Sequence, residues 1–429
     1  MIAIPAALVE PGAARAGEDG KAGDGSAAAV GSETVTVAQV VAIALENRPE
    51  LAKLEHQAKA IEAKKASIAI VPPPMVEAGT AVPFTDPLSF PEATIMISQG
   101  FPLSKEPQHM AEVEAKKAEA VKEMSRSDAL MIAWEVADRY MAAASMQEEI
   151  DALRELEVQA VSMAGAAAIM SSSGMGDASM AALAGVEVEM LKGEREAMEE
   201  GLAAEKTMLA IMAGMDPDAL AGVRLVLPAY EELVADPVSA MAQAVEASPG
   251  IAIIDAEIAA MKAEGKVAKD AFYPMMTISV GYSYKSNMLM GLMGKDAFMI
   301  SAGITIPLWR KKYAAGVEAI EEGLTAMSFE KEVEAVGVKG EVAAAWAEIA
   351  SIQAGHRALV GKVIPQANLA WELALAAYST GGVDLAAVID ALGMLEEATR
   401  SKVEMEGDHA RARARWYRAL GVPPEDWWT

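Results

Sequence analysis

Three methionines in one short segment are the side chains of this sequence best suited to holding a soft metal ion. Met288, Met290 and Met293 lie close together along the chain, and thioether sulfur binds soft ions such as Cu(I) and Ag(I). The chain contains 28 methionines in total, so such a group also arises where methionine simply fills apolar space. We therefore predict a candidate metal contact here, with hydrophobic packing as the competing interpretation.

Glycine and aspartate three residues apart form a second recurring pattern. It occurs as Gly174 with Asp177 and again as Gly381 with Asp384. Glycine tolerates the positive φ that ends many helices. An aspartate that begins the next helix accepts hydrogen bonds from free N–H groups and is favoured by the helix dipole. Each pair therefore predicts a turn between two helices. Asp390 follows Asp384 by about 240° around a helix, so the two do not share a face.

Other kinds of site chemistry find little support in the sequence. The chain has no cysteine, which excludes disulfides, thiolate catalysis and cysteine-based zinc sites. The four histidines, at 56, 109, 356 and 409, form no closely spaced metal-binding pair. Neither a phosphate-binding glycine loop nor a Gly-x-Ser-x-Gly elbow is present. We predict that the protein is not an enzyme and needs no cofactor.

Composition restricts the class of partner and favours long helices. The 62 acidic and 36 basic residues give a net charge of −26, whereas binding to phosphate backbones needs clustered lysine and arginine, so we expect no nucleic-acid partner. Hydrophobic residues make up 53% of the chain but aromatic residues only 5%. Such a composition, rich in alanine and methionine, suits helices.

The chain is a tandem repeat with a period of about 200 residues. The landmark pairs are Pro49 and Pro249, Pro74 and Pro274, Pro102 and Pro307, Gly174 and Gly381, and Gly214 and Gly421. Ordered landmarks with a small drift in spacing indicate duplication, and duplication implies internal pseudo-symmetry.

Each half is expected to contain the same elements in the same order. A helix (37–70, then 237–271) precedes two strands (75–82 and 93–101, then 275–284 and 298–306). A long helix (105–170, then 310–378) and a return helix (178–212, then 385–420) follow. Residues 277–284 alternate in type with period two, as a strand with two different faces must.

The long helices need a continuous packing partner along their sides. Apolar residues recur in three- and four-residue steps, which is the pattern of a coiled-coil seam. The seam comprises Leu153, Leu156, Ala160, Met163, Ala167 and Met170. A helix of sixty-odd residues extends roughly 100 Å. Taken alone, this seam suits a soluble coiled-coil scaffold equally well.

The strand pairs argue against a simple rod. Their length is close to the 9–11 residues that cross an outer membrane when tilted. Four strands cannot close a barrel, and an open edge in lipid leaves backbone groups unsatisfied. Three chains would supply twelve strands, which is an allowed closed barrel.

Four stretches, taken in order, resemble a known family. They are residues 35–51 (VTVAQVVAIALENRPEL), 272–282 (FYPMMTISVGY), 304–312 (ITIPLWRKK) and 363–390 (VIPQANLAWELALAAYSTGGVDLAAVID). The first is similar to the usual start of TolC-like outer-membrane efflux proteins. The next two resemble their entry into and exit from a barrel strand, and the last resembles their proline, tyrosine-x-x-glycine and aspartate run. The resemblance spans 33–422, although the first half replaces the tyrosine version of the turn at 171–177.

The resemblance implies a fold and a division into parts. The fold class is mixed and mainly α: a long α-helical barrel joined to a transmembrane β-barrel with four strands per chain, closed as a trimer of twelve strands. Residues 1–32 would be a disordered segment or a remnant signal, 33–215 and 237–422 the two repeats, 216–236 a linker and 423–429 a tail.

The resemblance also implies a function and partners. The chain would be the outer-membrane exit duct of a tripartite efflux system in a Gram-negative bacterium, with its helical barrel in the periplasm. A homotrimer would pass small molecules or metal ions, as in heavy-metal resistance, that an inner-membrane transporter, of the resistance-nodulation-division type, delivers through a periplasmic adaptor. A type I protein secretion duct and a soluble coiled-coil scaffold are the alternatives.

Site residues follow from the same resemblance. The turn residues Gly174, Asp177, Gly381 and Asp384 would meet the adaptor at the periplasmic tip. Threefold symmetry would turn Asp384 or Asp390 into a ring of carboxylates that constricts the pore, with a solvated helix surface as the alternative.

Residues beside the strands would contact outer-membrane lipid. Aromatic side chains that flank the strands would anchor at the lipid interface, with core packing as the alternative. They are Phe272, Tyr273, Tyr282, Tyr284 and Trp309. The basic run 310–312 would meet lipid phosphate or simply begin a solvated helix.

Overall fold

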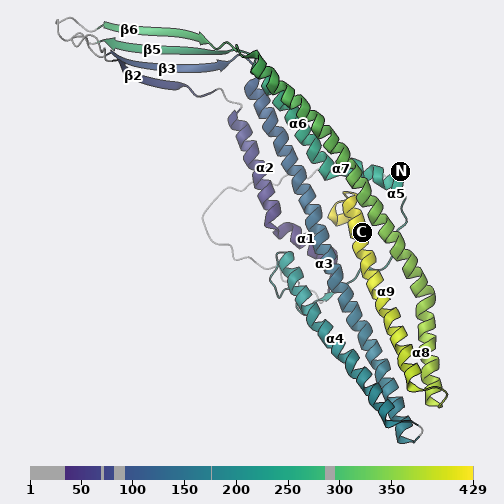
Figure 1. Cartoon of the computed structure of the whole chain (residues 1–429). Helices are drawn as coiled ribbons and strands as arrows, with labels where there is room; N and C mark the ends of the chain where they lie inside the picture. The colour runs from purple at the N-terminus through teal and green to yellow at the C-terminus, as the bar shows by residue number, and fades with distance from the viewer. Residues whose placement is uncertain (1–33, 69–71, 82–91, 175, 286–294, 429) are drawn as a thin grey trace.

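The chain folds into a long helical rod with a four-stranded sheet at one end (Figure 1). The computed structural model describes residues 34–68, 72–81, 92–174, 176–285 and 295–428.

None of the helices in these described ranges combines the length and the apolar composition that crossing a membrane requires.

The first half of the chain runs up to the sheet, back along the full rod and partly up again. Its elements are β1 (Thr34–Val35), α1 (Val37–Asn47), α2 (Pro49–Ile68), β2 (Met75–Ala81), β3 (Glu92–Pro102), α3 (Glu106–Ser172) and α4 (Ala178–Met212). Helix α3 has 67 residues, which corresponds to roughly 100 Å.

The second half follows the same course. Its elements are β4 (Arg224–Leu225), α5 (Pro237–Ala247), α6 (Pro249–Asp270), β5 (Met275–Lys285), β6 (Lys295–Ile304), α7 (Arg310–Ala358), a π-helical turn (Leu359–Val363), α8 (Ile364–Ser379), α9 (Leu385–Ala419) and a 3₁₀ turn (Pro424–Asp426). The two helical hairpins, α3–α4 and α8–α9, end together at the tip opposite the sheet (Figure 1).

The prediction of one continuous helix before each strand pair was wrong. In each half the segment breaks into two helices, because the residue before a proline is forced out of the helical region. Arg48, before Pro49, has φ −70° and ψ 119°, and Ser248, before Pro249, has φ −61° and ψ 121°.

The prediction of one long helix over 310–378 was also incomplete. A π-helical turn at Leu359–Val363 separates α7 from α8. Ile364 donates its N–H to the carbonyl of Leu359, five residues back. Pro365 follows immediately and has no N–H to donate, so the widened turn lies where the ordinary helical hydrogen-bond pattern is interrupted.

The strand pairs of the two halves join into one antiparallel sheet of order β2–β3–β5–β6. The halves meet between β3 and β5, where Ile97 pairs with Val280.

The predicted coiled-coil seam lies in the core of the α3–α4 and α8–α9 hairpins. All six of its residues, from Leu153 to Met170, are buried. They share one cluster with Leu191 of α4 and with Trp371 and Leu385 of the other hairpin.

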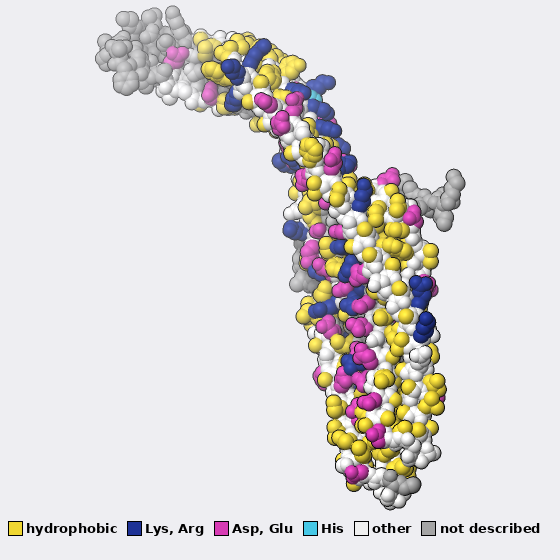
Figure 2. All heavy atoms as spheres, turned by 45° about the vertical axis from the view of Figure 1, so that its right-hand side comes forward, with side chains coloured by type: hydrophobic (Ala, Val, Ile, Leu, Met, Phe, Trp, Pro, Cys, Tyr) yellow, Lys and Arg dark blue, Asp and Glu magenta, His cyan; other side chains and the backbone are white. Residues whose placement is uncertain are grey.

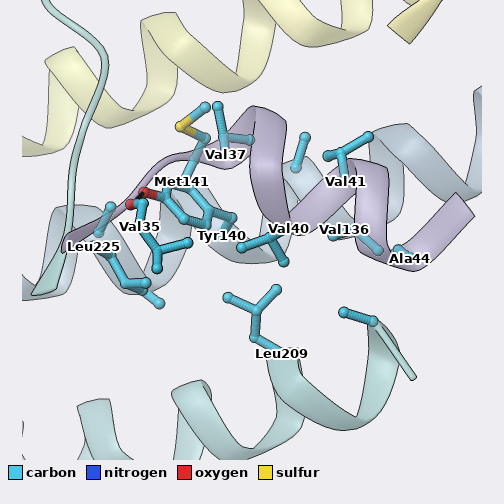
Figure 3. Packing of buried hydrophobic residues seen from close by; sticks show 14 of the residues in the cluster. Val35, Val37, Val40, Val41, Ala44, Val136, Tyr140, Met141, Leu209 and Leu225 are labelled. Carbon is cyan, nitrogen blue, oxygen red and sulfur yellow. Dashed lines mark hydrogen bonds between the residues drawn. The ribbon is translucent and has the colours of Figure 1, made fainter. Parts of the chain in front are cut away.

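A second core fixes the ends of the repeats to the middle of the rod (Figure 3). Strands β1 and β4 pair in parallel against α3. The Tyr140 hydroxyl donates to the carbonyl of Val35 at 2.5 Å and accepts from the N–H of Val226 at 2.8 Å. Burial raises the pKa of Tyr140 to about 12. This hydroxyl therefore joins both short strands to α3.

Candidate functional site

One face of the sheet is a continuous apolar surface. The register aligns Val76, Ile97, Val280 and Ile300 in one row across all four strands. Ala78, Ile95, Tyr282 and Phe298 form the neighbouring row. Ile97 is 51% exposed and Ile300 is 72% exposed. These side chains are open to the surroundings, which is unusual for a sheet face of this composition in water.

The opposite face of the sheet carries serines in β3, β5 and β6, together with Met75, Met96 and Met299. Ser98, Ser279 and Ser301 align across three strands. The Ser98 hydroxyl donates to Ser279 Oγ at 2.9 Å, and the Ser283 hydroxyl donates to Glu92 Oε1 at 2.5 Å. Ser283 is only 3% exposed. The two central strands thus partly shield serines on one face, whereas the other face exposes large apolar side chains, which is the reverse of a soluble protein.

The sheet projects beyond the rod and has two open edges. Strands β2 and β6 form its opposite edges and, within the described residues, neither pairs with a strand on its outer side. Exposed edges with free N–H and C=O groups are templates for further strand pairing. The sheet therefore needs both a partner for its edges and an apolar medium for one face.

Most of the aromatic residues beside the strands are exposed. Tyr273, Tyr282, Tyr284 and Trp309 all remain open to the surroundings. Phe272 packs against Tyr313 with ring centroids 5.5 Å apart. Core packing therefore accounts for Phe272 but not for the other four.

At the opposite end of the molecule, Gly381 forms the turn between α8 and α9. Its φ is 74°, and its N–H donates to the carbonyl of Tyr378 at 2.9 Å. Gly382 donates to the carbonyl of Ala377 at 2.8 Å. This pair of bonds is the Schellman arrangement that ends a helix when a left-handed residue follows it.

Gly174 occupies the corresponding position between α3 and α4. It has φ 76° and donates to the carbonyl of Ser171 at 3.1 Å. Both hairpins therefore turn at a glycine with positive φ, although their sequences differ at the turn.

Aspartates cap both return helices. Asp177 accepts from the N–H of Ser179 at 3.0 Å, and Asp384 accepts from the N–H of Ala387 at 3.1 Å. The hydrogen bonds from Ser179 hold the pKa of Asp177 below its ordinary value. Both carboxylates are exposed, so each combines a capping role with a negative charge at the tip.

Asp390 lies apart from Asp384, on a groove between the hairpins. The groove has a volume of about 940 Å³ and is lined by α4, α8, α9 and the π-helical turn. Its floor is mainly apolar, and Glu187 and Glu397 line it together with Asp390. Asp384 is not part of its lining.

The three candidate metal ligands Met288, Met290 and Met293 lie outside the described residues. Among the residues that are described, no group of three or more His, Asp or Glu side chains could hold a metal ion.

Sequence reasoning missed the charged cluster that joins the hairpins. Arg400 of α9 donates to Glu149 of α3 at 2.9 Å and to Glu194 of α4 at 2.6 Å. It also donates to Glu396 at 3.2 Å, and burial raises the pKa of Glu396. No local pattern marks Arg400, because its two inter-hairpin partners lie more than 200 residues away.

Comparison with known proteins agrees with this architecture. Residues 240–422 match the outer membrane efflux protein family. A comparison with curated protein sequences found no match.

Solved structures of outer-membrane channels have the same fold over nearly the whole chain. The outer-membrane channel OprN has a TM-score of 0.76 at 16% identity, covering 96% of this chain and 99% of that one. CusC has a TM-score of 0.75 at 16% identity, covering 90% and 92%. VceC from Vibrio cholerae has a TM-score of 0.72 at 17% identity, covering 90% and 96%. The predicted resemblance and the mainly α, mixed fold class are confirmed.

Proposed function

We propose that this chain is the exit duct of a tripartite efflux system. The premise is that its fold matches those of outer-membrane channels and that residues 240–422 match the outer membrane efflux protein family. It lies in the outer membrane of a Gram-negative bacterium, with its helices in the periplasm. The protein conducts passively, and the energy for export is supplied by its partners.

The observation that carries this proposal is the inverted sheet. A sheet with an exposed apolar face, a serine-containing opposite face and two open edges is unstable alone in water. Three copies would join β6 of one to β2 of the next and close twelve strands, which satisfies every edge. The apolar face would then contact lipid, and the serine-rich face would line a water-filled pore.

The two repeats define how each subunit contributes to the duct. We assign residues 33–215 and 237–422 to the repeats and 216–236 to the linker between them. Each repeat supplies two strands and one long hairpin, so a trimer has six hairpins at its tip. The capped turns at Gly174, Asp177, Gly381 and Asp384 are the surfaces that we assign to a periplasmic adaptor. An inner-membrane transporter of the resistance-nodulation-division type would deliver cargo through that adaptor.

We propose that the duct conducts small molecules. A narrower proposal, that its cargo includes soft metal ions, rests on residues 288–293. Replacing Met288, Met290 and Met293 by leucine keeps the apolar volume and removes sulfur. Reduced copper or silver tolerance of cells carrying this variant would support the metal proposal, and unchanged tolerance would refute it.

The mass of the detergent-extracted protein tests the duct directly. Light scattering that subtracts the detergent should give three copies of the 44.9 kDa chain, and the trimer should conduct ions in a planar bilayer. A monomer or dimer that stays soluble without detergent would contradict the duct and favour a soluble coiled-coil scaffold. Conductance does not distinguish small-molecule efflux from type I protein secretion. The second measurement is therefore the drug tolerance of a deletion strain, and its loss would favour small-molecule efflux.

A further inference from the structure

A basic and apolar surface lies where the sheet joins α7. We define this junction surface as Ile306, Leu308, Trp309, Arg310, Lys311 and Lys312. All six residues are exposed, and Trp309 is 72% exposed. The apolar members directly continue the strand β6, and the three cations form the first turn of α7.

The three cations of the junction surface have no acidic partner within the described part of the chain. Lysines farther down the rod behave differently. Lys266 pairs with Glu112 at 2.7 Å, and Lys331 pairs with Asp255 at 2.6 Å. Because acidic residues outnumber basic ones 62 to 36, three adjacent cations without a carboxylate are exceptional here. Figure 2 shows Lys and Arg gathered near the sheet end of the rod, whereas Asp and Glu are more frequent along the hairpins.

Two further cations lie at the neighbouring helix ends. Lys105 precedes α3, and Lys269 is in the last turn of α6. Both are exposed and neither forms an ion pair with another described residue. The tilted contact between the Phe272 and Tyr313 rings holds the end of α6 beside the start of α7, so Lys269 adds to the positive charge of the same junction.

The stability of α7 itself does not explain these cations. Positive side chains in the first turn of a helix are opposed by the helix dipole. The first turn of α7 contains no acidic residue, and Trp309 provides no side-chain cap. Helix α9, by contrast, begins with Asp384 as a hydrogen-bonded cap. An anion from outside the chain would relieve the unfavourable charge at the start of α7.

We propose that the junction surface binds the headgroups of anionic phospholipids in the leaflet that faces the helices. This inference rests on the proposed function, because it requires the sheet to lie in a bilayer. The apolar face of the sheet ends at Ile304 and continues through Ile306 and Leu308, so Arg310 follows at the depth of the phosphates. Lysine and arginine next to an anionic surface each strengthen association roughly fivefold.

The apolar residues explain why the ligand is a lipid and not a free anion. Ile306, Leu308 and Trp309 lie beside the cations and remain exposed. A soluble phosphate would neutralise Arg310 to Lys312 and leave these three side chains in water. A phospholipid satisfies both parts of the surface, since its headgroup meets the cations and its acyl chains meet the apolar residues.

Competition between two lipids tests the proposal. The trimer in detergent is mixed with equal amounts of phosphatidylglycerol and phosphatidylcholine, and the lipids that remain bound are counted by native mass spectrometry. Wild-type protein should retain phosphatidylglycerol preferentially. In the variant R310Q/K311Q/K312Q the preference for phosphatidylglycerol should be at least about tenfold weaker. The variant R310K/K311R/K312R keeps the three charges and should keep the preference.

A matched control removes the same charge elsewhere. Lys53, Lys192 and Lys362 are exposed, lie on the rod away from the sheet, and form no ion pair among the described residues. K53Q/K192Q/K362Q should behave as wild type. An equal loss in both triple variants would show a general effect of net charge and overturn the proposal.

The remaining outcomes separate this inference from the proposed function. A detergent-bound trimer that shows no lipid preference would refute the junction surface and leave the duct intact. A protein that needs no detergent and retains no lipid would refute both. A light-scattering mass for each variant confirms that any lost lipid does not result from a lost trimer.

Discussion

Gly407 of α9 lies directly against Ser145 of α3. A Cβ atom added at Gly407 would be 1.9 Å from Ser145 Oγ and 3.0 Å from Ser145 Cβ. The 1.9 Å contact is shorter than real side chains allow and the 3.0 Å contact is tighter than most of them, so the two helices approach this closely because position 407 has no side chain. Gly407 therefore fixes the distance between the first and second repeats at this level of the rod.

Replacing Gly407 by alanine should destabilise the protein. Alanine favours helix by about 1 kcal/mol, but the overlap with Ser145 forces the helices apart, and overpacking typically costs 1–3 kcal/mol. We expect a lower thermal midpoint for G407A. The double variant S145G/G407A moves the methyl group to the other helix and should recover much of the loss. A midpoint for G407A equal to or above that of wild type would contradict the close contact.

Removing the Tyr140 hydroxyl should loosen both short strands. Y140F deletes the bonds to Val35 and Val226 and leaves only the 3.3 Å bond from the Val226 N–H to the Val35 carbonyl, at a cost of about 0.5–1.5 kcal/mol. Hydrogen exchange at residues 34–35 and 224–226 should accelerate while exchange at the tip stays unchanged. Y417F is the control, since the Tyr417 hydroxyl forms no hydrogen bond among the described residues. Equal acceleration in both variants would argue against a specific role for Tyr140.

His409 should make stability depend on pH. Its side chain is 1% exposed, and burial, with the charges of Arg413 and His356, lowers its pKa from 6.5 to about 4. The unfolded chain therefore binds the proton more readily than the folded one. This contribution to stability is complete above pH 6.5 and is lost as the pH falls towards 4, by up to roughly 3 kcal/mol.

The histidine can be isolated by comparing variants across that range. H409Q keeps a polar group beside Gln353, which lies 3.3 Å from the ring, and cannot titrate. Its thermal midpoint should fall less than that of wild type between pH 6.5 and 4. H56Q, at an exposed position, should follow wild type. Parallel curves for wild type and H409Q would show that other groups cause the acid sensitivity.

The elements that the sequence predicts well are those with local causes. Alternation in residues 277–284 predicts a strand because side chains alternate across a sheet, and the seam from Leu153 to Met170 predicts a packed helix because its steps repeat locally. The break before Pro49 also has a local cause, because the residue before a proline is disfavoured in the helical region, yet the prediction of one helix over 37–70 missed it.

The contacts between distant residues could not be predicted in this way. Arg400 meets Glu149 across 251 positions and Glu194 across 206, and a sequence with 62 acidic residues offers no way to choose those two. The closeness of Gly407 to Ser145 likewise depends on how α3 and α9 cross. Neither residue belongs to a motif, so only the packed structure identifies them.

Charge at the tip can be tested apart from helix capping. Asparagine caps a helix about as well as aspartate, so D384N removes the negative charge and keeps the hydrogen bond to Ala387, whereas D384A removes both. If a trimer places Asp384 or Asp390 at a constriction, three carboxylates are lost together. The cation preference of the bilayer conductance should then fall in D384N or D390N.

The control is D236N, which alters the cap of α5 away from the tip and should leave the cation preference unchanged. An unchanged preference in D384N, D390N and the double variant would place the constriction elsewhere, and a stability loss confined to D384A would assign Asp384 a capping role alone.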